Sequence, residues 1–267
     1  PPLAGAQGLA LDPDRGVDSY TKLMLHADGA DQGTSFTDSS SGAKTVTNNE
    51  SYDSYTKLML HMDGSGNSFV DSAASKSVTA NGNVTQTAAQ FKFDSRTAFF
   101  DGSGDYLSLA DSDDWNFGSG DFTIDFLVEL ADTGEQRFAA QWEDGDSYWM
   151  FDFQPAPTNL LRFVYRNNGS QETIVSRSWS PSTNILYHLA VVRYGNNWYI
   201  AIDGDIGTAT SNSSNLVNLN GSFYIGYIPV TAYLTGWLEE YRISKGIARW
   251  TSNFTPPSSP YGKVYTV

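Results

Sequence analysis

Few residues in this chain have the type and spacing that catalysis needs. There is no cysteine, which excludes disulfide scaffolds, thiolate zinc sites and cysteine nucleophiles. Three histidines are present, and His188 stands inside an apolar run, so we interpret it as a packing residue rather than a base. The chain has no Gly-x-Ser-x-Gly elbow, no His-Glu-x-x-His motif and no glycine loop of the phosphate-binding type. We therefore predict no catalytic residues and no enzymatic activity.

The charge balance limits the partners that the chain can bind. Thirty acidic residues against sixteen basic ones leave a net charge of -14. This balance argues against nucleic acid and anionic lipid as partners, because phosphate binding needs a local excess of Lys and Arg. No apolar run approaches the roughly 20 residues of a membrane-spanning helix, so we expect no membrane insertion. The first residues lack the basic and apolar regions of a signal peptide, which leaves the compartment open.

The elements that must position any functional residue are predicted to be strands. Residues 122–130 alternate between apolar and polar side chains, which is the period of a half-buried strand. Gly195-Asn196-Asn197 and Asp203-Gly204 separate further apolar runs and favour tight hairpins. Hydrophobic residues make up 40% of the chain, enough for a packed core. Roughly a dozen short strands with frequent turns predict an all-β antiparallel sandwich or jelly roll.

A repeat marks the N-terminal part of the chain. The nine residues Asp18–His26 recur letter for letter as Asp53–His61. The similarity continues through Phe36–Ser39, which matches Phe69–Ser72, and through Thr45–Thr47, which matches Ser77–Thr79. Nothing after residue 83 is duplicated. A unit of about thirty residues is too short to bury a core by itself. We interpret it as a truncated copy of the first strands of the domain.

These patterns predict four parts of the chain. Residues 1–17 are rich in Pro and Gly and are predicted to be an N-terminal arm. Residues 18–52 form the truncated repeat segment, 53–261 the jelly-roll domain and 262–267 a C-terminal tail.

Seven segments in order resemble a laminin-G-like, concanavalin-A-like jelly roll. They are Leu58–Gly64, Phe69–Ser72, Phe99–Leu107, Asp114–Ile124, Tyr187–Arg193, Trp198–Gly204 and Gly236–Ser244. Residues 247–257 resemble the tail that follows such domains in bacterial and phage proteins. The resemblance implies a concanavalin-A-like sandwich over residues 53–261. It leaves function open, because that fold serves sugar-binding modules, adhesion domains, glycoside hydrolases and virion proteins.

The resemblance also implies a calcium ion as cofactor. Many members of the family hold calcium between the opening loop and the last strand, which here places Asp63, Asp71, Glu239 and Glu240 at the site. Hard cations need several convergent oxygen ligands. The alternative is that Asp63 and Asp71 cap turns and that Glu240 pairs with a base.

Sugar recognition would use partly exposed aromatic rings as stacking platforms. Trp142 and Trp179 are flanked by polar residues and turns, so we predict them as the carbohydrate-binding pair. Arg162 and Arg166 fall on one face of their strand and suit acidic sugars, with surface ion pairing as the alternative.

The repeat segment predicts an assembly role. Tyr20, Leu23 and Leu25 belong to a strand-forming segment without a domain of its own, which needs a partner strand. That partner is either the equivalent strand at Tyr55–Leu60 or a neighbouring subunit.

Three functions are open at this point. The first is a non-enzymatic structural or adhesion protein of a phage virion or bacterial surface, such as a decoration or appendage protein. Its partners would be copies of itself, other virion or surface proteins, and cell-surface polysaccharide, and its location the virion surface or the cell exterior. The second is a calcium-dependent glycan-binding module, and the third a divergent glycoside hydrolase.

Overall fold

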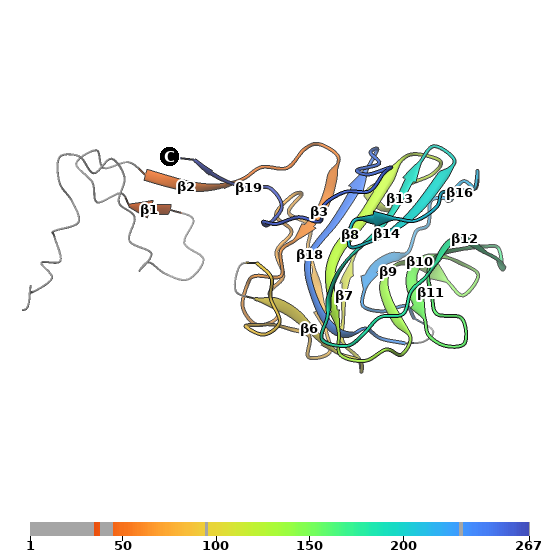
Figure 1. Cartoon of the computed structure of the whole chain (residues 1–267), viewed down its shortest axis with the longest axis horizontal. Helices are drawn as coiled ribbons and strands as arrows, with labels where there is room; N and C mark the ends of the chain where they lie inside the picture. The colour runs from red at the N-terminus through yellow and green to blue at the C-terminus, as the bar shows by residue number, and fades with distance from the viewer. Residues whose placement is uncertain (1–34, 38–44, 94–95, 230–231, 267) are drawn as a thin grey trace, which may run out of the picture. The chain divides into compact units, whose positions relative to one another are not determined.

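The structure is a computed structural model that describes residues 35–37, 45–93, 96–229 and 232–266 (Figure 1). These residues fall into two compact units. The smaller unit contains three short strands from both ends of the chain, and the larger unit runs from Tyr52 to Tyr261. Tyr20, Leu23 and Leu25 lie outside the described residues, so their predicted pairing stays a prediction.

The larger unit is a sandwich of two antiparallel sheets (Figure 1). The first sheet has seven strands in the order β12-β11-β10-β9-β17-β7-β4. Their bounds are β4 (Thr79–Asn81), β7 (Tyr106–Leu109), β9 (Gln136–Asp144), β10 (Ser147–Gln154), β11 (Leu160–Asn167), β12 (Ser170–Ser178) and β17 (Ser222–Ile225).

The second sheet has nine strands, seven of them in the order β15-β14-β13-β8-β18-β6-β5. Of the other two, β16 pairs with β14 and β3 with β18. The bounds are β3 (Thr56–Leu60), β5 (Thr85–Thr87), β6 (Thr97–Asp101), β8 (Phe122–Leu130), β13 (Leu186–Tyr194), β14 (Asn197–Ile202), β15 (Asp205–Ile206), β16 (Thr210–Ser211) and β18 (Thr235–Lys245). A single 3-10 turn, η1 (Asp113–Trp115), is the helical element of the described residues.

The predicted hairpin at Asp203-Gly204 is confirmed. Asp203 has φ 51° and Gly204 φ 80°, and the two residues connect β14 to β15. Positive φ at both central positions is what a tight hairpin turn of this type requires, and Gly and Asp tolerate it best.

Strand β8 shows how the core is built. Phe122, Ile124 and Phe126 point into the core between the sheets and are fully buried. The intervening Thr123 and Asp125 face outward, yet they are also fully buried. A surface sheet would expose this second face to water, so another part of the chain must cover it.

The covering element is the C-terminal segment, residues 247–261. Trp250 and Phe254 stack on each other at 4.0 Å and pack against the outward side chains of Ala190 and Val192 on β13. Tyr261 Oη donates a hydrogen bond of 2.7 Å to Asp125. The predicted tail of the family therefore serves as a third layer over the nine-stranded sheet.

The smaller unit consists of β1 (Ser35–Thr37), β2 (Thr45–Glu50) and β19 (Lys263–Thr266), in the order β1-β2-β19. Its pairing repeats that of the larger unit. Thr37 pairs with Thr45, and their repeat equivalents Val70 and Ser77 also pair. The sequence repeat therefore reproduces the same backbone hairpin twice.

The third strand extends this parallel. Thr47 of β2 pairs with Thr266, whereas its equivalent Thr79 of β4 pairs with Ser108 of β7. Strand β19 thus takes the position beside the first copy that β7 takes beside the second.

Candidate functional site

The outer face of the seven-stranded sheet gathers aromatic side chains, and we call it the aromatic face. Six residues define it: Tyr106, Trp142, Tyr148, Tyr224, Tyr227 and Tyr233. They come from β7, β9, β10, β17 and the loop between β17 and β18. Period-2 alternation brings the four strand residues to one side of the sheet, because side chains at the neighbouring positions fill the core.

Four tyrosines form one part of the aromatic face. Tyr227 stacks on Tyr106 at 4.6 Å and on Tyr233 at 4.8 Å, and Tyr224 meets Tyr227 edge to face at 5.8 Å. All four are partly exposed. Burial, with Tyr233 beside it, raises the pKa of Tyr227.

A tryptophan and a tyrosine form the second part. Trp142 and Tyr148 are cross-strand neighbours whose rings stack at 4.9 Å and 18°. Trp142 is partly exposed, whereas Tyr148 is buried beneath its partners. Gly221 allows β17 to approach here, because a Cβ at that position would lie 1.7 Å from the carbonyl oxygen of Trp142.

Polar groups border this stack. Arg166 lies opposite Tyr148 on β11 and forms an ion pair of 3.2 Å with the exposed Asp146. The hydroxyl of Tyr148 donates to Gln171 on β12 at 2.8 Å. A flat ring beside guanidinium, carboxylate and amide groups can stack on the apolar side of a sugar ring and bind its hydroxyls.

An ion-pair network occupies the other end of the same face. Asp152 is fully buried between Arg137, at 3.0 Å, and Arg162, at 2.9 Å. Glu135 binds Arg137 and Gln154. Burial alone would raise the pKa of Glu135, but the hydrogen bond and charge of Arg137 lower it. A carboxyl held ionised in this way suits a structural ion pair better than a general acid.

The structure places Arg162 and Arg166 on one outer face, as predicted, and both form ion pairs. Trp179 lies elsewhere. It is 6% exposed and belongs to the core, where it meets Phe153 and Tyr187 edge to face at 5.2 and 5.1 Å. The structure therefore does not bring Trp142 and Trp179 together on one face.

Two of the predicted calcium ligands bind backbone amides. Asp71 is 3% exposed and accepts hydrogen bonds from the amides of Met59, Ala73, Ala74 and Lys76. Glu239 accepts from two amides of the loop before β6.

The other two lie in different surroundings. Glu240 is joined to His61 at 2.5 Å and accepts from the amide of Tyr261. Asp63 is partly exposed in the loop after β3. Among the described residues no group of three or more His, Cys, Asp or Glu side chains is placed to hold a metal ion. The calcium site stays a prediction that these placements do not support.

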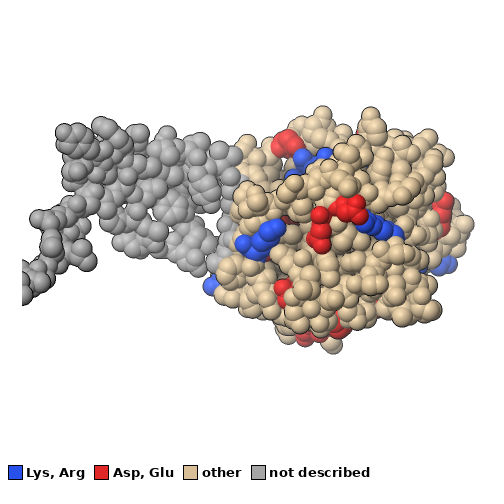
Figure 2. Space-filling model, in the orientation of Figure 1, with Lys and Arg blue, Asp and Glu red and all other residues tan. Residues whose placement is uncertain are grey.

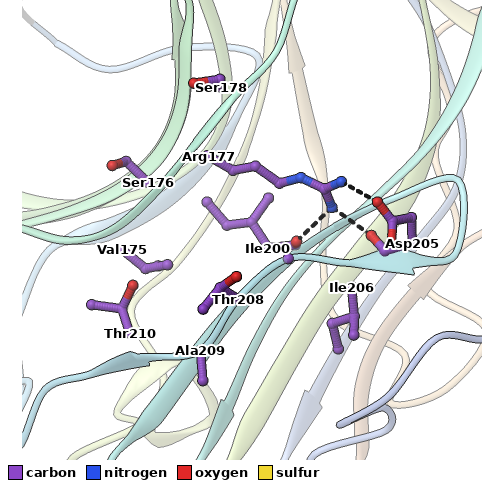
Figure 3. Close-up of a pocket in the computed structure, with 11 residues that line it drawn as sticks. Val175, Ser176, Arg177, Ser178, Ile200, Asp205, Ile206, Thr208, Ala209 and Thr210 are labelled. Carbon is purple, nitrogen blue, oxygen red and sulfur yellow. Dashed lines mark hydrogen bonds and ion pairs between the residues drawn. The ribbon is translucent and has the colours of Figure 1, made fainter.

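A hollow opens between the edges of the two sheets. It has a volume of about 570 Å³ and lies between β12 and the chain from β14 to β16 (Figure 3). Arg177 reaches across it, donating to the carbonyl oxygens of Ile200 and Asp205 and pairing with the Asp205 carboxylate at 2.5 Å. Ser176, Ser178, Thr208 and Thr210 also line the hollow.

On the face in Figure 2, Lys and Arg side chains are few and scattered, and acidic side chains lie among them. None of the helices in the described residues is long and apolar enough to cross a membrane.

The two antiparallel sheets define an all-β sandwich protein. Residues 101–249, more than half of the chain, match the Concanavalin A-like lectin/glucanases superfamily. The chain belongs to this superfamily, which confirms the predicted jelly roll. No curated protein was found to match the sequence.

Solved structures share the fold at low sequence identity. Domain 4 of AbnA, an extracellular GH43 arabinanase from Geobacillus stearothermophilus solved in complex with arabinotriose, matches with a TM-score of 0.59 and 16% identity over 72% of this chain and 93% of that one. The binding domain of botulinum neurotoxin serotype D matches with a TM-score of 0.56 and 14% identity over 73% of this chain. The binding domain of neurotoxin DC in complex with SialylT matches with a TM-score of 0.51 and 14% identity over 73% of this chain. The chain spans about half the length of both toxin domains.

Sequence reasoning missed the four tyrosines. Tyr224, Tyr227 and Tyr233 are close in sequence, and that spacing was the available signal. The alternation that places Tyr106 and Tyr224 on the outer side of their strands was readable, but the pairing of β7 with β17 was not.

Proposed function

We propose that this chain is a carbohydrate-binding module that binds its glycan on the aromatic face. The observation that carries the proposal is the partly exposed Trp142 ring, stacked on Tyr148 with Arg166 and Gln171 beside it. Membership of a lectin and glucanase superfamily supports it. The arabinanase domain solved with arabinotriose and the toxin domain solved with SialylT support it as structural neighbours.

The test compares Trp142→Ala with Tyr194→Ala. Tyr194 is 55% exposed at the end of β13 and lies outside the aromatic face, so its variant is a matched loss of an exposed ring. A glycan array, followed by calorimetry with the best ligand, should show about tenfold weaker binding for Trp142→Ala, or ~1.4 kcal/mol. Tyr194→Ala should bind like the parent chain. Equal binding by both variants would exclude the aromatic face.

Arabinotriose and a sialylated trisaccharide are the first probes, because they represent a neutral and an acidic ligand. Preference for the acidic one would favour Arg166 as its partner. Repeating the titration with EDTA tests the calcium-dependent alternative. Hydrolysis of either probe would overturn the prediction that the chain is not an enzyme.

An assembly role on a virion or bacterial surface is a second proposal, and the smaller unit supports it. Its sheet ends in two edge strands, β1 and β19. Edge strands offer backbone groups to another chain, and a sheet this small gains stability from further strands. Light scattering should give an oligomer for the full chain and a monomer after deletion of residues 1–50. Equal oligomeric states for both would refute the assembly role.

A further inference from the structure

Glu129 is a carboxylate on the outer face of the nine-stranded sheet. It follows Val128 of β8, whose side chain points into the core, and alternation turns Glu129 to the opposite side. Its cross-strand neighbours are Leu186 on β13 and Trp237 on β18. The position is far from the aromatic face, which belongs to the other sheet.

One oxygen of this carboxylate is buried without a hydrogen-bond donor. Glu129 is 6% exposed, and its Oε1 has no hydrogen-bond partner among the described residues. Burial raises its pKa, and no neighbouring charge contributes to the shift. A buried acceptor without a donor costs free energy, so the site is unfavourable as it stands. A ligand that supplied a donor, and above all a positive charge, would relieve that cost.

The surroundings provide an apolar surface that a ligand can reach. Trp237 is partly exposed and its ring lies 5.1 Å from that of Phe99, at 38°. Leu186 is also partly exposed, and Ile185 beside it is 48% exposed. The C-terminal segment packs on a different part of this sheet, against Ala190 and Val192 of β13. Glu129 therefore lies between two partly exposed side chains, one of them an aromatic ring.

We propose that Glu129 and Trp237 form a binding site for an organic ammonium group carried on an apolar body. The cation would pair with the carboxylate in a poorly solvated place, where such a bond is strong. The Trp237 ring would attract the same cation and cover the apolar body. The net charge of -14 favours the approach of cations to the protein.

A metal ion fits this place less well than an ammonium. Calcium and magnesium need several oxygen ligands, and the register places Leu186 and Trp237, which offer none, on either side of Glu129. The proposal does not depend on glycan binding at the aromatic face, because the two sites lie on different sheets.

Benzylamine and benzyl alcohol make the test, because they share an apolar ring, are close in size and differ in the charge of the terminal group. Calorimetry on the full chain should show binding of benzylamine at least tenfold tighter than that of benzyl alcohol. Glu129→Gln keeps the shape of the side chain and should remove this difference. Trp237→Phe should weaken benzylamine binding several-fold, whereas Trp142→Ala should leave it unchanged.

Each other outcome has a defined meaning. Equal affinity for the two compounds, unchanged benzylamine binding in Glu129→Gln, or no binding by the parent chain would overturn the proposal. Loss of benzylamine binding in Trp142→Ala alone would assign it to the aromatic face and leave the proposed function standing. Thermal unfolding of each variant checks folding, and Glu129→Gln should melt no lower than the parent chain.

Discussion

At the scale of single residues, Glu129 makes the stability of the fold depend on pH. Its pKa in the folded chain is raised above the ordinary value of 4.5, so the folded state holds this proton more tightly than the unfolded state. The favourable contribution is fully present below pH 4.5 and is lost as the pH rises through the folded pKa. We expect Glu129→Gln to remove this decline and to gain roughly 1 kcal/mol at pH 7. Urea unfolding between pH 4 and pH 8 measures it, with Glu143→Gln as an exposed control. Parallel curves for Glu129→Gln and the parent chain would contradict the prediction.

Asp71 gives a second prediction at this scale, and it separates a structural role from calcium binding. Its two carboxylate oxygens serve four backbone amides. Asp71→Ala should destabilise the fold by about 2–3 kcal/mol, because buried donors lose their acceptor. Asp71→Asn keeps one acceptor oxygen and should lose less. If added calcium stabilised the parent chain but not Asp71→Ala, the structural explanation would be incomplete.

At the scale of elements, a buried ion pair joins β8 to β18. Asp125 is fully buried and accepts two hydrogen bonds from Arg242, at 3.0 and 3.1 Å. Burial alone would raise the pKa of Asp125, but the charge of Arg242 lowers it from 3.8 to about 2. This depressed pKa contributes stability above pH 3.8, about 2 kcal/mol, which is lost as the pH falls towards 2.

The variant Asp125→Asn tests that pair. It leaves Arg242 buried without a counterion and should cost about 3–5 kcal/mol at pH 7. It should also remove the loss of stability between pH 4 and pH 2. Asp146→Asn is the matched control, because the carboxylate of Asp146 is 68% exposed in its pair with Arg166 and such pairs contribute about 0–1 kcal/mol. Similar losses of unfolding free energy in both variants would show that the buried pair between β8 and β18 contributes no more than an exposed pair.

At the scale of the whole molecule, the larger unit should fold without the rest of the chain. Residues 52–261 contain both sheets, the core and the C-terminal segment that covers β8. We expect this fragment to melt within a few degrees of the full chain and to retain glycan binding. Calorimetric unfolding of residues 52–261 and of the full chain provides the measurement. A fragment that unfolds or aggregates at 25 °C would show that the smaller unit stabilises the sandwich.

Much of the fold could be predicted from local patterns. The alternation over residues 122–130 predicted that β8 is a strand and which of its side chains face the core. Asp203-Gly204 predicted a hairpin. Both signals depend only on neighbours in sequence. The repeat at Asp18 and Asp53 likewise anticipated two related segments, and the structure adds that Thr37 and Val70 take the same pairing.

Site residues were harder to predict, because their environment depends on distant strands. Trp142 and Trp179 look alike in sequence, each beside polar residues and a turn. The first lies on an outer face and the second in the core, since sheet order and the path of the neighbouring strands decide what covers each ring. Asp71 and Glu239 were predicted as calcium ligands, but in the structure both accept hydrogen bonds from backbone amides.

The sequence by itself determined the strands, the all-β sandwich class and the absence of cysteine chemistry, because these follow from period-2 alternation, turn residues and composition. The tertiary structure alone decided which side chains meet. Glu129 lies between Leu186 and Trp237, residues 57 and 108 positions further along the chain. Such neighbours arise from sheet order and register, and these depend on the packing of the whole sandwich rather than on any local pattern.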